Sequence, residues 1–328
     1  MKAKTIQQDI ESKINDWALS IEDDQLSKEV VKNAVVTGGC IASMFLQENV
    51  NDYDVYFTDV RTTFKVAVYY INEMNLGADI RLTLNNRDDV SGLPHTTTGN
   101  KNDEFWSDKL LVSPSNEFLT MSNSELDKYL SETSRVEVFI SSAGVCGDLD
   151  QDADQHHEAN DDGGDKYRPV FISSNAVTLS HKMQLVLRFI GTPAQIHESY
   201  DFAHATNYWT EDEGLVTNTE ALEALLAREL VYRGSKYPLA SIFRTRKFIQ
   251  RGWGLHIGNY VKMAIQLNEF DLTDVKVLEE QLTGVDSLYM HQVISAIKEQ
   301  TDRDPSFEFT ALYVCEICDR MMGADRHL

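Results

Sequence analysis

The stretch from residue 34 to residue 57, AVVTGGCIASMFLQENVNDYDVYF, constrains the fold more than any other part of the chain. AVVT has the apolar, β-branched composition of a short strand, and Gly38 and Gly39 follow it as a turn. From Cys40 to Gln47 the apolar side chains repeat at helical spacing, and DYDVYF then alternates as a second strand. The stretch therefore predicts a strand, a glycine turn, a short helix and a strand in immediate succession.

The same patterns continue on both sides of this stretch. Helical spacing predicts two helices in residues 5–33, separated by EDDQ, and one in RTTFKVAVYYINEMN. Alternation predicts strands in DIRLTLNN, RVEVFISS, PVFISSNAVTL and YDFAHAT, whereas SHKMQLVLRFIG is predicted as a helix capped by Ser180. Beyond about residue 207 the pattern is helical throughout. We therefore predict an α+β domain over residues 1–206 and an all-helical domain over residues 207–328.

Charge and hydropathy exclude some classes of protein. The net charge of −22 argues against a broad surface that coats nucleic acid. The lack of an apolar run of eighteen residues and of a signal peptide predicts a soluble, cytoplasmic protein without a membrane span. Residues 148–165 hold eight carboxylates and no Lys or Arg, which predicts a mobile acidic loop. One basic segment, residues 228–251, holds seven basic residues against one acid.

Asp52 and Asp54 are the strongest candidates for chemistry. Carboxylates two residues apart on a strand project from one face, and they repel each other unless a cation lies between them. Oxygen ligands of this kind suit Mg²⁺ or Mn²⁺, which bridges carboxylates to substrate phosphates. Gly38 and Gly39 would let a phosphate approach the free N–H groups at a helix start. The alternative is an ordinary strand-to-helix turn beside the solvated side of an edge strand.

VVTGG followed after twelve residues by DYD resembles the nucleotidyltransferase fold of the DNA polymerase β superfamily. Within that superfamily the flanking residues are most similar to tRNA CCA-adding enzymes and bacterial poly(A) polymerases. YDFAHATNYW resembles that group's Arg-Arg-Asp-Phe-Thr-x-Asn-Ala strand, and YPLASIFRTRKFIQRGW resembles its Asp-Pro-Leu-Arg helix. The chain departs from the group at Ala42-Ser43 and Ser199-Tyr200, where the group has Arg-Asp and Arg-Arg, and we find no Glu-Asp-x-x-Arg element. The resemblance implies a nucleotidyltransferase-fold mixed sheet with flanking helices, followed by a helical C-terminal domain.

The resemblance also implies a reaction, the transfer of a nucleoside monophosphate from an NTP to an acceptor hydroxyl. Two divalent metal ions, Mg²⁺ or Mn²⁺, would position the triphosphate and activate the acceptor. Asp52 and Asp54 are the expected metal ligands and catalytic residues. The third carboxylate is expected to be Asp201, which aligns with the group's aspartate, with Glu137 and then Asp79 as alternatives.

The triphosphate also needs cations and backbone donors. The expected nucleotide-binding residues are Gly38, Gly39, Ser43, Arg244, Arg246 and Lys247. Arg244 and Lys247 share one helical face with Arg251, although a solvated charged face is the alternative reading of this cluster. Lys182 and Arg188 could also reach phosphate, but lone basic residues on amphipathic helices usually face water.

The acceptor and the oligomeric state stay open. The family resemblance favours an RNA 3′ end such as that of tRNA, but the net charge of −22 weakens that preference. Nucleotidylation of a protein or small molecule is the alternative, and a non-catalytic nucleotide-binding or structural protein with the same fold is another. CEIC at Cys315–Cys318 has metal-ligand spacing but lacks a second pair, so ordinary core thiols are expected there.

Overall fold

The computed structural model describes residues 2–74, 78–83, 96–98, 109–127, 130, 135–140, 167–272 and 274–282, and the single positions 303, 310, 312, 313 and 316. The predicted acidic loop at 148–165 and the cysteine pair at 315 and 318 lie outside the described residues. None of the helices in the described ranges combines the length and the apolar composition that a membrane span requires.

Contacts between residues divide the chain into two units. The first unit comprises residues 1–198 and 205–222, and the second comprises residues 199–204 and 223–328. The chain thus crosses between the units three times, after residues 198, 204 and 222. The domain boundary after residue 206 stays a prediction.

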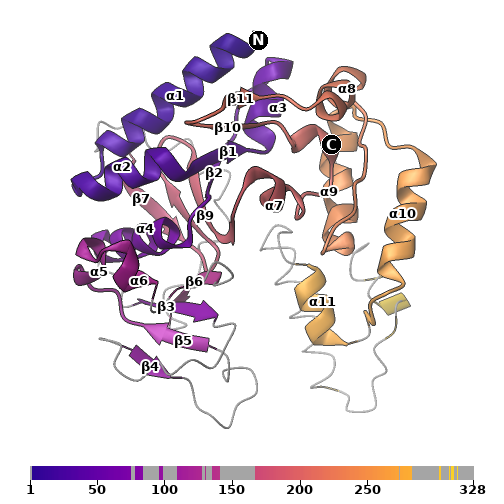
Figure 1. The fold of residues 1–328 in the computed structure, drawn as a ribbon. Coiled ribbons are helices and arrows are strands. Elements are labelled where there is room, and N and C mark those ends of the chain that lie inside the picture. The colour runs from indigo at the N-terminus through magenta and orange to yellow at the C-terminus, as the bar shows by residue number, and fades with distance from the viewer. Residues whose placement is uncertain are drawn as a thin grey trace. The chain divides into compact units, whose positions relative to one another are not determined.

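The first unit is built on a seven-stranded mixed sheet, called the main sheet below. The pair β2 and β9 is parallel, and every other pair of neighbouring strands in this sheet is antiparallel. This sheet with its flanking helices confirms the predicted α+β class (Figure 1). In spatial order the strands are β11 (Gly214–Val216), β10 (Tyr208–Thr210), β1 (Ala34–Thr37), β2 (Tyr53–Phe57), β9 (Met183–Ile190), β8 (Ala176–Leu179) and β7 (Pro169–Ile172).

One face of the main sheet forms the core. Strand register aligns Val36, Val55, Leu185 and Val177 across four strands, and all four side chains are fully buried. The helices whose buried residues join this core are α1 (Ala3–Leu19), α2 (Asp24–Asn33), α3 (Gly39–Leu46) and α4 (Val60–Glu73). Helix α1 contributes its predicted apolar face, which ends at the fully buried Trp17. Burying such a face supplies most of the stability of an amphipathic helix.

The predicted helix in SHKMQLVLRFIG is wrong, because this segment is the central strand β9. Met183, Leu185 and Leu187 are buried at every second position and the residues between them are not. The segment also places apolar residues at helical spacing, so local pattern alone favours neither structure clearly. Pairing with β2 and β8 on its two sides decides in favour of the strand.

The helical pattern predicted beyond residue 207 is also interrupted. Residues 208–216 form the hairpin β10–β11, which adds to the main sheet through β1. YDFAHAT, predicted as a strand, contains only an isolated bridge from Phe202 to Tyr232 and a turn of 3₁₀ helix, η2 (Ala203–Ala205).

A second, fully antiparallel sheet completes the first unit and is called the small sheet. In spatial order its strands are β4 (Thr96–Thr98), β5 (Lys109–Val112), β3 (Ala78–Thr83) and β6 (Arg135–Ile140). The short helices α5 (Glu117–Thr120) and α6 (Asn123–Leu126) follow β5. Phe118 of α5 packs edge-to-face on Phe64 of α4, with ring centroids 5.2 Å apart, which ties these helices to the core.

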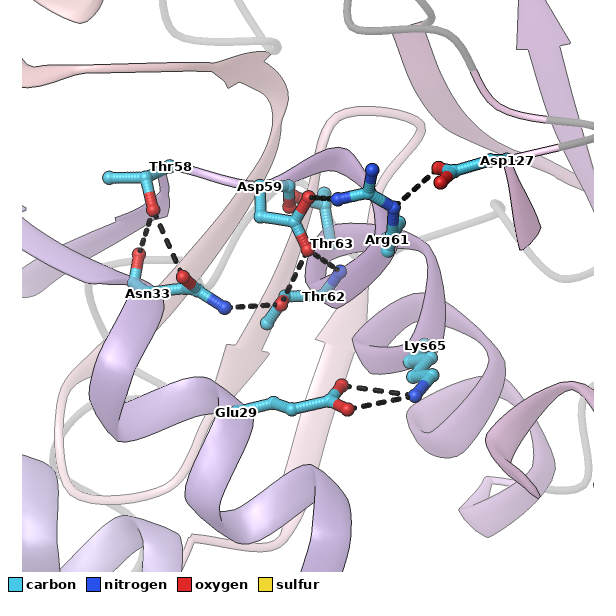
Figure 2. A network of polar contacts seen from close by, with 9 residues as sticks. All are labelled: Glu29, Asn33, Thr58, Asp59, Arg61, Thr62, Thr63, Lys65 and Asp127. Atoms are coloured by element: carbon cyan, nitrogen blue, oxygen red, sulfur yellow. Dashed lines mark hydrogen bonds and ion pairs between the residues drawn. The ribbon is translucent and has the colours of Figure 1, made fainter. Parts of the chain in front are cut away.

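A polar network fixes the start of α4 (Figure 2). Asp59 caps the helix by accepting hydrogen bonds from its first turn, and Arg61 bridges Asp59 and Asp127. Lys65, whose side chain is fully buried, donates to both carboxylate oxygens of Glu29 on α2 at 3.0 and 3.1 Å. A buried ammonium requires such a partner because desolvation of the charge is costly.

The second unit is helical apart from isolated bridges, as far as it is described. Its described helices are α8 (Thr219–Ala227), α9 (Pro238–Gln250), α10 (Ile257–Leu267) and α11 (Val275–Gln281), and loops join them. Helix α8 begins in the first unit. The buried His204 ring lies 4.7 Å from Phe248 and 4.6 Å from Trp253, centroid to centroid. Burial, opposed by the charge of Asp201, lowers the pKa of His204 to about 4, so this histidine is neutral at pH 7.

Candidate active site

The predicted glycine turn lies between β1 and α3. Gly38 has φ 90° and ψ −149°, a conformation that residues with a side chain avoid, and its N–H donates to Ala205 O at 3.1 Å. Gly39 is the first residue of α3, and no side chain caps this helix. A Cβ atom added to Gly39 would meet no atom within 4 Å. The start of α3 therefore combines uncapped helical N–H groups with free space where a side chain would otherwise stand.

Strand pairing brings Asp54 to this turn, and Asp52 directly precedes β2. Thr37, the residue before Gly38, is the direct cross-strand partner of Asp54. Tyr53 and Val55, which alternate with the aspartates, pack toward the core, so Asp54 projects from the opposite face of the main sheet. The predicted turn and the predicted carboxylates therefore occupy one end of the β1–β2 pair.

The electrostatics agree with this placement. Burial, and secondarily the charge of Asp52, raise the pKa of Asp54 well above its ordinary value. Burial followed by the charges of Asp54 and Asp52 also raises the pKa of the Cys40 thiol in the first turn of α3. Asp52, Asp54 and the first turn of α3 are thus close enough to affect one another's protonation.

This donor set fits Mg²⁺ or Mn²⁺ bound together with a phosphate. Two carboxylates that repel each other in a desolvated place are stabilised in their charged form by a cation between them. Mg²⁺ binds proteins through one or two carboxylates and takes its remaining ligands from water and substrate phosphates. Among the residues that the structure describes, no group of three or more His, Cys, Asp or Glu side chains forms a ready-made metal cage.

The face of the main sheet that carries Asp54 also carries a line of polar side chains. Register places Tyr208, Thr37, Asp54, Gln184 and Thr178 side by side on five adjacent strands, and this line is called the polar row below. Thr37 is fully buried, whereas the other four side chains are half-buried. The polar row lies back to back with the apolar row of the core, as the two-residue period of a strand requires.

His197 is a site residue that the sequence analysis missed. It ends the short helix α7 (Pro193–His197), and its Nε2 lies 2.8 Å from Thr37 Oγ1. The Thr37 hydroxyl also lies within hydrogen-bond distance of two carbonyl oxygens, that of Asn207 at 2.9 Å and that of Ala205 at 3.3 Å. Carbonyl oxygens only accept, so a proton on Nε2 of His197 lets the Thr37 hydroxyl accept from the histidine while it donates to a carbonyl. No sequence pattern links these residues, because the contact depends on the path of the chain after β9.

The three candidates for the third carboxylate belong to the second unit and to the small sheet. Asp201 belongs to the second unit, where its carboxylate accepts a hydrogen bond from Arg244 at 2.6 Å. Glu137 and Asp79 lie on the small sheet, with Glu137 directly opposite Arg81 and Asp79 accepting from the Ser113 hydroxyl at 2.8 Å. Neither lies on a strand that neighbours β2.

The other predicted nucleotide-binding residues are distributed over both units. Arg246 is half-buried and Lys247 exposed on α9 of the second unit, together with the paired Arg244. Ser43 is half-buried, a full turn into α3, and its carbonyl oxygen accepts the N–H of Glu48 at 2.9 Å.

Lys182 and Arg188, which were expected on a helix, instead precede and occupy strand β9. The ammonium of Lys182 donates to Val50 O at 3.0 Å, and its own carbonyl accepts the Tyr53 N–H at 2.7 Å. His181 and Lys182 both have positive φ, 61° and 60°, which is strained for residues other than glycine. This turn therefore holds the segment that leads into the two aspartates.

The chain was compared with protein-family models, with curated proteins and with solved structures. Residues 8–228 match the model of a family described as "Gad2: Gabija anti-defense 2 family protein", and this match covers more than half of the chain. No curated protein matches the chain.

One solved structure that resembles the chain is the CCA-adding enzyme of Bacillus stearothermophilus in complex with CTP. The identity is 11%, the TM-score 0.31, and the match covers 84% of this chain and 50% of that enzyme. The chain therefore spans about half the length of the enzyme, and a likeness of this size does not establish a shared activity.

Proposed function

The chain belongs to the Gabija anti-defense 2 family, and we propose that it acts in this role as a metal-dependent nucleotidyltransferase. The reaction is the transfer of a nucleoside monophosphate from an NTP to an acceptor hydroxyl, with pyrophosphate as the second product. The activity and its link to anti-defence are both part of the proposal.

One observation carries this proposal. The register of β1 with β2 pairs Thr37 with Asp54, so the glycine turn and the two aspartates adjoin one another. A glycine-lined helix start binds phosphate oxygens through backbone N–H groups, and paired carboxylates bind the divalent ion that accompanies a triphosphate. Either half alone is common in proteins. Their juxtaposition supports a Mg²⁺–triphosphate site.

Each part of the candidate site would then have its own role in the reaction. The uncapped N–H groups of α3 bind the β- and γ-phosphates, and the missing side chain of Gly39 allows their close approach. Asp52 and Asp54 would hold the divalent ion, which would neutralise phosphate charge and lower the pKa of the acceptor hydroxyl. His197 keeps Thr37, and with it the end of β1, in place. The acceptor oxygen bonds to the α-phosphorus while the bond to the bridging oxygen breaks, pyrophosphate leaves, and the hydroxyl proton passes to solvent.

Several finer assignments belong to the same proposal. Asp201 stays the first candidate for a third carboxylate, ahead of Glu137 and Asp79. In that role its carboxylate would have to leave Arg244 and bind the metal ion instead. Gly38, Ser43, Arg244, Arg246 and Lys247 stay proposed contacts of the nucleotide. The RNA 3′ end favoured by the sequence resemblance also stays a proposal, against which the net charge of −22 argues.

A second candidate function is nucleotide binding without transfer. It is favoured by the finding that the described residues do not gather three metal-ligating side chains. Most two-metal transferase sites require a third ligand to activate the acceptor.

Radiolabelled nucleotide transfer by the full chain distinguishes the two candidates. The chain is incubated with each α-labelled NTP, Mg²⁺ or Mn²⁺, and cell extract, and both acceptor-bound label and pyrophosphate are measured. We expect wild type to transfer label and Asp54→Asn to lose transfer by at least a hundredfold. Asp212→Asn, at an exposed turn position of the same unit, is the matched control and should retain full transfer. NTP binding without any transfer by wild type contradicts the transferase and supports the second candidate.

A further inference from the structure

The polar row continues beyond the residues used so far. Gln184 on β9 is the parallel partner of Asp54, and Thr178 on β8 is the antiparallel partner of Gln184. Partners in register project from the same face, so these side chains follow Asp54 at intervals of roughly 4.8 Å, the spacing of neighbouring strands. The opposite neighbour of Asp54 is Thr37, which leads into the glycine turn. Asp54 therefore has the phosphate-binding turn on one side and two neutral polar side chains on the other.

Gln184 and Thr178 differ from Thr37 in their hydrogen bonding. Thr37 is fully buried and bonded to His197 and to Asn207. Gln184 and Thr178 are half-buried, and neither side chain forms a hydrogen bond with another residue in the described part of the chain. Both side chains are partly exposed, so the amide and the hydroxyl are open to solvent and are available to hydrogen-bond a ligand.

The geometry of phosphoryl transfer assigns these two residues a place in the reaction. The attacking oxygen and the leaving oxygen lie on opposite sides of the α-phosphorus. If pyrophosphate leaves toward the glycine turn on the β1 side of Asp54, the acceptor hydroxyl must approach over β9 and β8. That side of Asp54 is occupied by Gln184 and Thr178.

We infer that Gln184 and Thr178 line the acceptor subsite, and that the acceptor is a hydroxyl of a polypeptide side chain. This inference rests on the proposed transferase function and names its substrate class. The Ser, Thr or Tyr oxygen of the acceptor forms a phosphodiester bond to the α-phosphorus. The bond from the α-phosphorus to the bridging oxygen breaks, pyrophosphate carries away that oxygen, and the hydroxyl proton passes to solvent.

The charge of the subsite favours a polypeptide over RNA. An RNA 3′ end brings a phosphate next to the reacting hydroxyl, and its binding normally requires several cations. Gln184 and Thr178 are neutral, and the ammonium of Lys182 at the start of β9 already donates to Val50 O. The net charge of −22 further repels a polyanion. An amide and a hydroxyl instead match the peptide N–H and C=O groups that flank a side-chain hydroxyl.

The test compares acceptor labelling with nucleotide binding in the same variants. Full-length wild type, Q184A and T178V are given α-labelled NTP and Mn²⁺ with either RNase-treated, dialysed cell protein or deproteinised total RNA. Affinity for α,β-methylene analogues of the four NTPs is measured separately by calorimetry. Gln250→Ala, at the exposed end of α9, is the matched glutamine control.

We expect label on the protein pool that resists RNase and is removed by protease. Loss of one hydrogen bond to the acceptor should lower labelling by about tenfold in Q184A and T178V. Affinity for the analogues should stay within about threefold of wild type, and Gln250→Ala should match wild type in both measurements.

Label on RNA overturns the inference, whereas no label on either pool contradicts the transferase function on which the inference rests. Undiminished labelling by both Q184A and T178V overturns it as well. Equal losses of labelling and of analogue affinity also overturn it, because the two residues then serve the nucleotide. Failure of wild type to bind any analogue refutes the proposed function itself, and so is distinguishable from failure of the subsite alone.

Discussion

The two glycines of the turn should respond in opposite ways to the same added methyl group. Gly38 adopts φ 90° and ψ −149°, and an alanine forced into such a conformation costs about 1–3 kcal/mol. For domains of 150–250 residues this corresponds to a melting temperature lower by roughly 2–12 °C. A methyl group on Gly39 meets no atom within 4 Å, and alanine favours a helix, so G39A should melt at or slightly above the wild-type temperature.

The effect of G39A should appear in nucleotide affinity instead. The methyl group would occupy the space through which a phosphate approaches the start of α3. Loss of one charge-assisted hydrogen bond costs about 1.5–3 kcal/mol, which lowers the affinity for Mg²⁺–NTP by roughly tenfold to a hundredfold. Thermal melts without ligand and calorimetric titration with NTP analogues measure the two effects separately. If G39A binds the nucleotide as tightly as wild type, Gly38-Gly39 is an ordinary turn and the phosphate site is refuted.

Three further predictions concern the scaffold. Because burial lowers the pKa of His204 to about 4, the free energy of unfolding should be highest above pH 6.5 and fall by about 3 kcal/mol as the pH drops toward 4. Urea unfolding at each pH measures this, and a free energy of unfolding that stays constant between pH 6.5 and 4 contradicts the prediction. Glu29→Gln leaves the fully buried Lys65 charge without this carboxylate and should lower the free energy of unfolding by about 3 kcal/mol. Lys65→Met should lower it by less, because the Glu29 side chain is 21% exposed and can be solvated. Equal losses in the two variants would show that Lys65 finds another partner. Asp201→Asn should lower the melting temperature by a few degrees because Arg244 loses its partner at 2.6 Å, and an unchanged melt would mean that the pair adds nothing.

Local patterns predicted the elements whose structure is decided locally. The strand, turn, helix and strand of residues 34–57 follow from short periodic runs and a glycine pair, and the structure contains all four. Strand β9 was mispredicted because its residues fit a helical period as well as an alternating one, and only its pairing with β2 and β8 settles the matter. Strands β10 and β11 are three residues each and owe their existence to pairing with β1 and with each other.

The candidate site also combines features that the local sequence reveals with features that depend on strand pairing. The carboxylate pair and the glycine turn are contiguous motifs, so residue type and spacing were enough to find them. That Thr37 stands opposite Asp54 depends on strand register, which the sequence does not state. His197 and Gln184 reach the site from segments more than a hundred residues downstream, and neither belongs to a motif. Residues of this kind can be found only once the pairing of the main sheet is known.

Mn²⁺ binding by Asp54→Asn tests the central claim most directly, with electron paramagnetic resonance in the presence and absence of an α,β-methylene NTP analogue. The account predicts that wild type binds Mn²⁺ and that the analogue tightens this binding, because carboxylates and phosphates share the ion. Asp54→Asn should lose Mn²⁺ affinity by at least tenfold and lose the tightening, while Asp212→Asn should retain both. Equal Mn²⁺ affinity and equal tightening in wild type and Asp54→Asn would contradict the account.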